Sequence, residues 1–275
     1  MISKSVWLPK GNLKIVGIAT LTYINHLSLL FSDVKEKMSI KEFAKPRLLR
    51  PLFISMTIHF FQQSTGINVV MFYCAKIFET AGFKEDSTMV PILIGLIQLL
   101  ASAISFFLID RGGRRFLLII GGVGMCISCF TLGAYYFVSI NPASNSAYKG
   151  PDIAWVAVTS VSVYIVGFVI AWGPITWLLM SEVFPVKARG TASGIASAFN
   201  WFCSFIMTLT FEIFIDALKA SGTFWLYGGL AFVAVVFVFV FVPETKGKSL
   251  EEIQQYFEGK GKRKTNSGPE RESDV

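Results

Sequence analysis

Seven consecutive residues, Gln62-Gln63-Ser64-Thr65-Gly66-Ile67-Asn68, place three amides and two hydroxyls inside an apolar stretch. Residues 51–75 around them carry no formal charge, and a helix of 25 residues is long enough to cross a bilayer. Amide side chains in hydrocarbon are costly unless they find partners or line a wet cavity. Two interpretations stay open: the amides bind a polar ligand, or Gln62 and Gln63 hydrogen-bond to neighbouring helices.

The spacing of the amides predicts a break in their helix. On an ideal helix, Asn68 points about 120–140° away from both glutamines. If all three amides serve one site, the helix must unwind near Ser64–Gly66, where a glycine permits it. Helices broken near the bilayer midplane are a common way to build a polar ligand site inside a membrane.

The composition indicates an all-α polytopic membrane protein. Of the 275 residues, 53% are hydrophobic and only 16% are charged, whereas about a quarter are charged in a soluble domain. The uncharged residues form six long runs, which predict a bundle of six transmembrane helices. We therefore expect an N-terminal segment and cytoplasmic linker over residues 1–50, a membrane domain over 51–242 and a cytoplasmic tail over 243–275.

The basic residues alternate between the predicted loops. Eighteen lysines and arginines lie in the loops and tails on one side of the predicted bundle, and four (Lys76, Lys84, Lys149 and Lys219) lie on the other. This asymmetry predicts that both ends of the six-helix block are cytoplasmic, and we expect a plasma-membrane protein. The net charge of +7 is explained by the same distribution, so no nucleic-acid partner is expected.

Two of the predicted spans contain helix-distorting or helix-packing signals. In the fourth, residues 153–181, Pro174 has no N–H and crowds the carbonyl of Ile170, which predicts a kink. Two interpretations of that kink stay open. It is either a hinge that moves Trp177, or a static kink next to Trp177 at the membrane interface. In the fifth, residues 190–211, the small residues Gly190, Gly194 and Ala198 predict close helix packing.

The remaining spans and the tail are simpler. The second span, residues 89–109, holds one buried amide, Gln98. The sixth, residues 223–242, is so uniformly apolar that we expect it to face lipid over most of its surface. After it, Ser249 and Glu252 have capping-box spacing and predict a short helix.

Charged residues gather at short turns between spans. Asp110, Arg111, Arg114 and Arg115 surround two glycines between the second and third spans, and Glu182 and Arg189 bracket the turn into the fifth. The arginines either only set the topology or form a fixed charge network.

Metal and enzyme chemistry have little support. Cys74, Cys126, Cys129 and Cys203 all lie in apolar spans, and the two histidines, His26 and His59, stand alone. The spans contain no catalytic constellation of nucleophile and base or of paired carboxylates. We expect no metal, no cofactor and no enzymatic activity.

Six motifs in order resemble the sugar porter family of the major facilitator superfamily. They are Gln62-Gln63-x-x-Gly66-Ile67-Asn68, Asp110-Arg111-x-Gly113-Arg114-Arg115, Gly173-Pro174-Ile175-x-Trp177, Glu182 with Arg189, Asn200-Trp201 and Pro243-Glu244-Thr245-Lys246-Gly247. Within the family, the chain looks most like insect facilitated trehalose transporters. The resemblance covers roughly residues 46–258 and only the second six-helix half of a transporter. A missing N-terminal half is therefore the expected partner, and the chain is expected to be a C-terminal half or a fragment.

The resemblance implies facilitative transport of a trehalose- or glucose-like sugar by alternating access. It implies that sugar binds at Gln62, Gln63, Asn68, Gln98, Trp177 and Asn200. It implies gating by Phe72, Tyr73, Gly173, Pro174, Asp110, Arg111, Arg114, Arg115, Glu182 and Arg189. Thr176 replaces the family's usual second proline. The alternative is a non-transporting sugar sensor or a partner subunit of other transporters.

Overall fold

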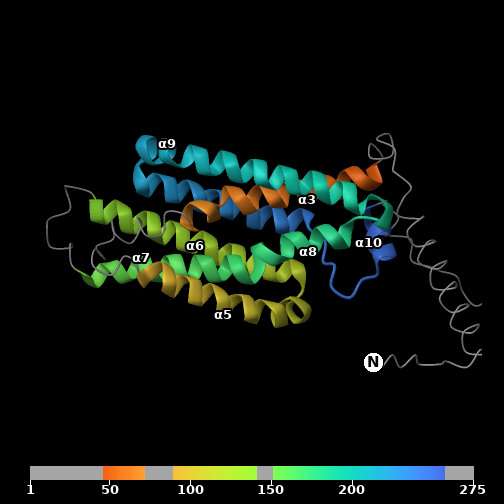
Figure 1. Cartoon of the computed structure of the whole chain (residues 1–275), viewed down its shortest axis with the longest axis horizontal. Coiled ribbons are helices and arrows are strands. Elements are labelled where there is room, and N and C mark those ends of the chain that lie inside the picture. The colour runs from red at the N-terminus through yellow and green to blue at the C-terminus, as the bar shows by residue number, and fades with distance from the viewer. Residues whose placement is uncertain (1–45, 72–88, 141–150, 258–275) are drawn as a thin grey trace, which may run out of the picture.

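The computed structural model describes residues 46–71, 89–140 and 151–257, and its regular structure there is helical throughout. The elements form an elongated bundle (Figure 1). They are α3 (Pro46–Ser64), α5 (Met89–Gly112), α6 (Arg114–Ile140), α7 (Pro151–Gly167), the π-helical turn η2 (Phe168–Trp172), α8 (Gly173–Val183), α9 (Val186–Phe241) and α10 (Leu250–Phe257).

Four helices in the described ranges are long and apolar enough to cross a membrane. One of them, α9, is 56 residues long and reverses direction at Lys219, whose φ of 61° and ψ of 173° are not helical. Figure 1 shows the two arms of α9 running side by side. The fifth and sixth predicted spans are thus two arms joined by a minimal turn. The end of the first predicted span, with Phe72 and Tyr73, lies outside the described residues.

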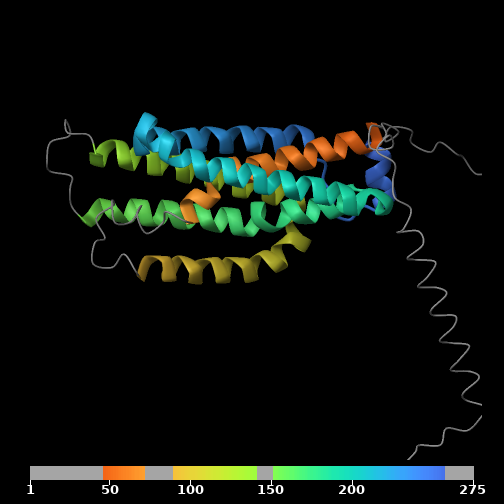
Figure 2. The ribbon, with the colours of Figure 1, turned by 45° about the horizontal axis from the view of Figure 1, so that its top comes forward.

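The packing leaves an apolar exterior. α9 lies along both α3 and α6, while α5 is at one edge of the bundle and contacts η2 and α7 (Figure 2). Trp172 and Tyr227 are fully buried, whereas Phe106 and Phe107 on α5 are 73% and 66% exposed. An exterior of this kind suits hydrocarbon rather than water. The predicted fold class, an all-α polytopic membrane protein, is confirmed.

Small residues bring helices together, although not where the sequence suggested. A Cβ on Gly121 of α6 would lie 2.6 Å from the carbonyl oxygen of Gly167, so this glycine pair permits a close crossing with α7. In contrast, nothing in the described ranges lies within 4 Å of a Cβ built on Gly190 or Gly194.

The packing prediction for the fifth span is therefore wrong for the described helices. The stripe that this arm of α9 buries is Ala188, Ala192 and Ala196. Two small-residue stripes with four-residue spacing run along the same arm, offset by two residues, and the spacing alone does not show which one is covered.

The sixth predicted span also has a buried side. Along the second arm of α9, a stripe that includes Thr223, Tyr227 and Ala231 is buried in the bundle. On its other side Phe232 and Phe239 are exposed, and that this side faces lipid stays a prediction.

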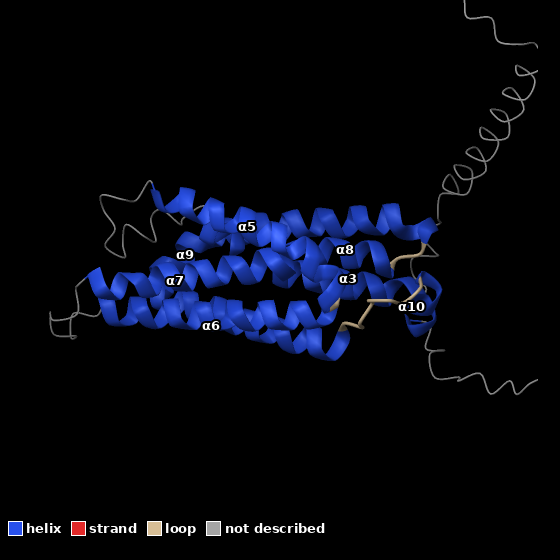
Figure 3. Ribbon diagram, turned by 90° about the horizontal axis from the view of Figure 1, so that it is seen from below, coloured by secondary structure: helices blue, strands red, loops and turns tan. Residues whose placement is uncertain are grey.

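The capping box predicted at Ser249 is confirmed. The backbone N–H of Ser249 donates to Glu252 Oε2 at 2.8 Å, and the N–H of Glu252 donates to Ser249 Oγ at 3.2 Å. Ile253 and Phe257 are buried on one side of the resulting helix, α10. Figure 3 shows α10 beyond one end of the bundle, beside the connecting loops.

Candidate functional site

The predicted break in the first span is present. α3 ends at Ser64, Thr65 and Gly66 form a turn, and residues 67–71 are helical again. Gly66 has φ = +91°, a conformation that costs a glycine little and other residues much. The turn is closed by the Gly66 N–H, which donates to the Gln63 carbonyl at 3.1 Å.

Two tyrosines from other helices hold the broken segment. The Tyr164 hydroxyl of α7 donates to the Thr65 carbonyl at 3.0 Å. The Tyr227 ring of α9 covers Gly66 so closely that a Cβ there would lie 2.8 Å from Tyr227 Cδ2. Neither tyrosine was identified from the sequence, where the only signal was a phenol within an apolar run.

Four amides form a hydrogen-bonded chain next to the break. Asn68 Nδ2 donates to Gln63 Oε1 at 2.6 Å, and Gln63 Nε2 donates to Asn200 Oδ1 at 3.0 Å. Asn200 Nδ2 in turn donates to Gln62 Oε1 at 2.8 Å. Asn68 reaches Gln63 only because the helix unwinds between them. The chain therefore joins both sides of the break to the first arm of α9.

The amide chain ends on the distorted fourth span. Gln62 Nε2 donates to the Trp172 carbonyl at 2.9 Å and to Thr176 Oγ1 at 2.8 Å. Thr176 Oγ1 donates to the same Trp172 carbonyl at 2.9 Å. The threonine that replaces the family's second proline thus gives Gln62 an additional acceptor, a role that the sequence did not reveal.

The distortion predicted at Pro174 is confirmed as the π-helical turn η2, which directly precedes Gly173. Because Pro174 has no N–H, the Ile170 carbonyl loses its usual partner four residues on. Ser105 of α5 supplies a replacement, since its Oγ donates to the Ile170 carbonyl at 2.9 Å.

Burial differs along the amide chain. Gln62, Gln63 and Asn200 are 2%, 8% and 1% exposed. Asn68 is half-buried and donates also to Ser204 Oγ at 2.7 Å. Such bonds are those expected of interhelical hydrogen bonding, while sugar binding by the amides stays a prediction. Asn68 is the member of the chain nearest an accessible surface.

The other two predicted binding residues lie apart from the amide chain. Trp177 of α8 is 37% exposed, and its ring meets the His59 ring edge-on with 5.0 Å between the centroids. His59 is three residues before Gln62 on α3, so Trp177 lies about one turn from the amides. Gln98 is half-buried on α5 and takes no part in the hydrogen bonds described above.

A charged cluster occupies the end of the bundle near α10. Arg114 Nη2 lies 3.0 Å from Glu182 Oε1, and Arg114 Nε donates to the same oxygen at 3.2 Å. Thr245 Oγ1 donates to the other carboxylate oxygen, Glu182 Oε2, at 2.6 Å. Asp110 is 3.8 Å from Arg114, but its side chain is 77% exposed. These bonds join the start of α6, the end of α8 and the chain after α9.

Glu244 completes the charged cluster by capping α6. Its two carboxylate oxygens accept the backbone N–H groups of Arg114 at 3.0 Å and Arg115 at 3.1 Å. Anions are favoured at helix N-termini. A Cβ on Gly113, which has φ = +83°, would lie 2.8 Å from Glu244 Oε2. The sequence motif contained Glu244, but its role at the start of α6 depends on the fold.

The side chains of the other three predicted gating arginines do not pair with Glu182 or Glu244. The Arg115 guanidinium donates to the Phe239 carbonyl and lies 5.3 Å from the centre of the Phe239 ring. Arg189 donates to the Phe184 carbonyl at 3.4 Å, and it lines a cavity of about 300 Å³ together with Arg114 and Glu182. Arg111 is exposed, and its carbonyl accepts Lys246 Nζ. The structure thus brings Asp110, Arg114 and Glu182 together and leaves the other three at the margin of the cluster.

The comparisons with known proteins agree with this architecture. A family model described as "Sugar (and other) transporter" matches residues 26–257. The chain belongs to the sugar transporter family. The resemblance to sugar porters, and within them to insect trehalose transporters, is confirmed. The family is one of transporters, so the expectation that the chain is not an enzyme also stands.

The relatives include insect trehalose transporters and a proton:xylose symporter of known structure. The chain is 42% identical over 225 residues to the facilitated trehalose transporter Tret1-1 of Drosophila sechellia, covering 81% of this chain and 25% of that protein. It is 42% identical over 211 residues to Tret1 of Apis mellifera ligustica, covering 77% and 41%. The major facilitator superfamily proton:xylose symporter XylE, bound to 6-bromo-6-deoxy-D-glucose, superposes with a TM-score of 0.64 at 33% identity. That match covers 75% of this chain and 42% of XylE. The chain therefore matches less than half the length of each of these relatives.

Proposed function

We propose that the chain forms the C-terminal half of a facilitative sugar transporter that carries a trehalose- or glucose-like sugar by alternating access. Its partner would be a preceding six-helix half, with the sugar held between the two. Membership of the sugar transporter family supports this proposal, as does the share of the relatives that the chain covers. The observation that carries it is the chain of four amides at the break in α3.

Amides suit a sugar because each offers both a donor and an acceptor, as does every hydroxyl. In the described bonds, the NH₂ groups of Gln63 and Asn200 each donate one hydrogen, which leaves one on each available. A sugar hydroxyl that replaced Asn68 on Gln63 Oε1 would exchange one neutral hydrogen bond for another. The partly exposed ring of Trp177 would pack against the apolar face of the sugar.

The charged cluster is proposed as the gate that closes the cytoplasmic side. It holds α6, α8 and the chain after α9 together through Arg114, Glu182 and Glu244. Opening on this side would separate these elements, so the cluster would form and break once in each transport cycle.

The plasma-membrane topology is part of the proposal, and the loop charges support it. With Cys substituted separately at Lys219 and at Lys246, we expect an impermeant maleimide added to intact cells to label the first variant only. Both positions are exposed. Labelling of Lys246→Cys but not of Lys219→Cys would show that the chain has the opposite orientation in the membrane.

The binding role is tested in the complete transporter with labelled trehalose and glucose. We expect Asn68→Ala and Trp177→Ala each to raise KM about tenfold, the effect of losing one or two good contacts. The control is Thr210→Ala, which removes an exposed hydroxyl bonded only within its own helix. If Asn68→Ala lowers the melting temperature while KM stays constant, the amides serve as interhelical bonds and the binding proposal fails.

Reconstitution in liposomes distinguishes a transporter half from a sugar sensor or a partner subunit. We expect liposomes that contain the chain together with a sugar-porter N-terminal half to release trapped sugar. Saturable sugar binding without release from those liposomes would favour a sensor.

A further inference from the structure

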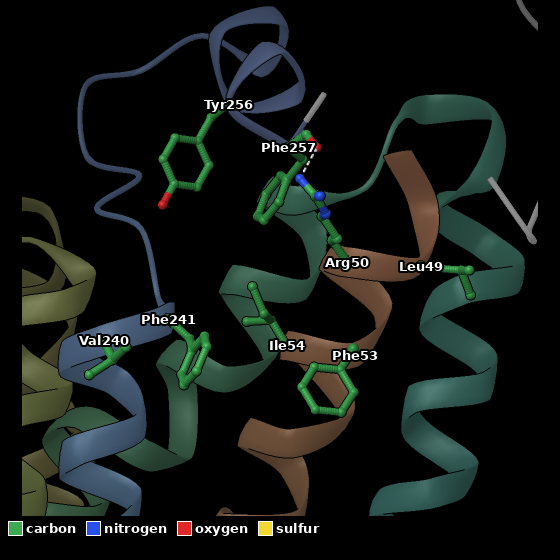
Figure 4. A pocket seen from close by; sticks show the side chains of 8 residues that line it. All are labelled: Leu49, Arg50, Phe53, Ile54, Val240, Phe241, Tyr256 and Phe257. Carbon is green, nitrogen blue, oxygen red and sulfur yellow. Dashed lines mark hydrogen bonds between the residues drawn. The ribbon is translucent and has the colours of Figure 1, made fainter. Parts of the chain in front are cut away.

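An apolar groove lies at the end of the bundle beside α10. Its volume is about 570 Å³, and its walls come from the first turns of α3, the last turn of α9 and α10 (Figure 4). Phe53 of α3 and Phe241 of α9 form apolar walls and are 64% and 53% exposed. Arg50 and Tyr256 are the polar members of the lining.

Arg50 is an available cation within these apolar walls. It is exposed, and its Nη1 donates to the Phe257 carbonyl at 3.4 Å, a long bond that uses one of five N–H donors. Figure 4 shows the guanidinium reaching up to α10, with the Tyr256 ring across the groove from it. A guanidinium binds phosphate oxygens in pairs, so the chemistry of this end of the groove favours a phosphate.

The apolar walls distinguish a lipid from a soluble anion. Phe53, Val240 and Phe241 continue the exposed apolar surface of α3 and α9, where an acyl chain would lie in the bilayer. A soluble phosphate would use Arg50 and leave these walls unused. The sequence also has six basic residues from Lys35 to Arg50 and seven after Pro243, and such clusters next to a membrane attract anionic lipids.

We propose that this groove binds one anionic phospholipid, with its phosphate on the Arg50 guanidinium and an acyl chain along Phe53 and Phe241. The lipid would then tie α10 to α3, in addition to the long bond from Arg50 to the Phe257 carbonyl. This inference does not depend on which solute the protein carries.

The test is native mass spectrometry of the full chain in neutral detergent, with dioleoyl phosphatidylglycerol or dioleoyl phosphatidylcholine added. We expect one tightly bound phosphatidylglycerol and at least about tenfold weaker phosphatidylcholine. Arg50→Gln should weaken phosphatidylglycerol binding about tenfold, as expected for a charge-assisted bond, and Arg50→Lys should retain part of it. Val240→Trp, at a 60% exposed position, should fill the groove and lower binding while the charge stays.

The matched control is Lys248→Gln, which removes a positive charge from an exposed residue near the same end of the bundle but outside the groove. It should leave phosphatidylglycerol binding unchanged. Equal losses in Lys248→Gln and Arg50→Gln would overturn the site. So would displacement of the lipid by millimolar glycerol phosphate, which would indicate a soluble-anion site. If deletion of residues 258–275 increased lipid binding several-fold, the C-terminal tail rather than a lipid would be the normal occupant of the groove.

Discussion

The two polar clusters of this bundle differ in charge: one consists of neutral amides and the other of ionised side chains. The amide chain at the break in α3 is neutral, and side chains make most of its bonds. The charged cluster near α10 joins a guanidinium to one carboxylate and two backbone N–H groups to another. A neutral hydrogen bond contributes only about 0.5–1.5 kcal/mol net, whereas a buried ion that loses its partner costs several.

This difference suits the two clusters to different work. Amides next to a broken helix exchange partners at little cost, which a site that binds and releases a hydroxylated solute requires. A carboxylate held by Arg114 and Thr245 is costly to leave unpaired, which suits a contact that must hold firmly while closed.

The largest expected effect is in the charged cluster. Glu182→Ala removes the carboxylate that Arg114 and Thr245 share, and we expect a loss of about 3 kcal/mol. The measurement is the apparent melting temperature of the purified chain in detergent. Asp110→Ala is the matched control, because Asp110 faces the same guanidinium from an exposed position, and we expect a change below about 0.5 kcal/mol. Equal losses in the two variants would show that burial does not set the strength of this cluster.

The break in α3 should be the next most sensitive point. Gly66→Ala forces a Cβ into a positive-φ position and against the Tyr227 ring, with an expected cost of about 2 kcal/mol. Gly194→Ala is the control, since its Cβ would meet nothing within 4 Å. In that helical position alanine should stabilise by about 0.5–1 kcal/mol. If Gly66→Ala and Gly194→Ala shift the melting temperature in the same direction, the proposed role of the turn at Gly66 is contradicted.

The smallest expected loss of stability distinguishes Tyr164 from Tyr227. Tyr164→Phe removes the bond to the Thr65 carbonyl and should cost about 1 kcal/mol. Tyr227→Phe should be neutral or slightly stabilising, because the Tyr227 hydroxyl is buried without a hydrogen-bond partner in the described parts of the chain. A loss in Tyr227→Phe as large as that in Tyr164→Phe would show that the Tyr227 hydroxyl has a partner of its own.

Local chemistry made several features predictable. Asn68 could join the glutamines only if the helix unwound at Gly66, and it does. Pro174 had to disturb the turn before it, and a π-helical turn lies there. The Ser249 capping box needed only four residues. In each case the cause and the effect lie within about one turn of chain.

Features that depend on a distant partner were not predictable. Which small-residue stripe of α9 the described helices cover depends on where α3 and α6 pack, and it is Ala188, Ala192 and Ala196 rather than Gly190 and Gly194. The Tyr227 ring meets Gly66 across more than 150 positions of sequence, and Glu244 reaches the start of α6 from the far end of α9. Nothing in the local sequence marks these contacts.

The amino-acid sequence by itself determined that this is a helical membrane protein of the sugar transporter family, with a broken first helix and a distorted fourth. Hydrophobic run length, proline and glycine chemistry and short motifs act locally, so they can be read without a fold. Only the tertiary structure decided that the amides bind one another, that Thr176 belongs to the amide chain and Glu244 to the charged cluster, and that Arg50 lies at an apolar groove. Those contacts depend on how the helices rotate and pack against each other, which residue spacing does not specify.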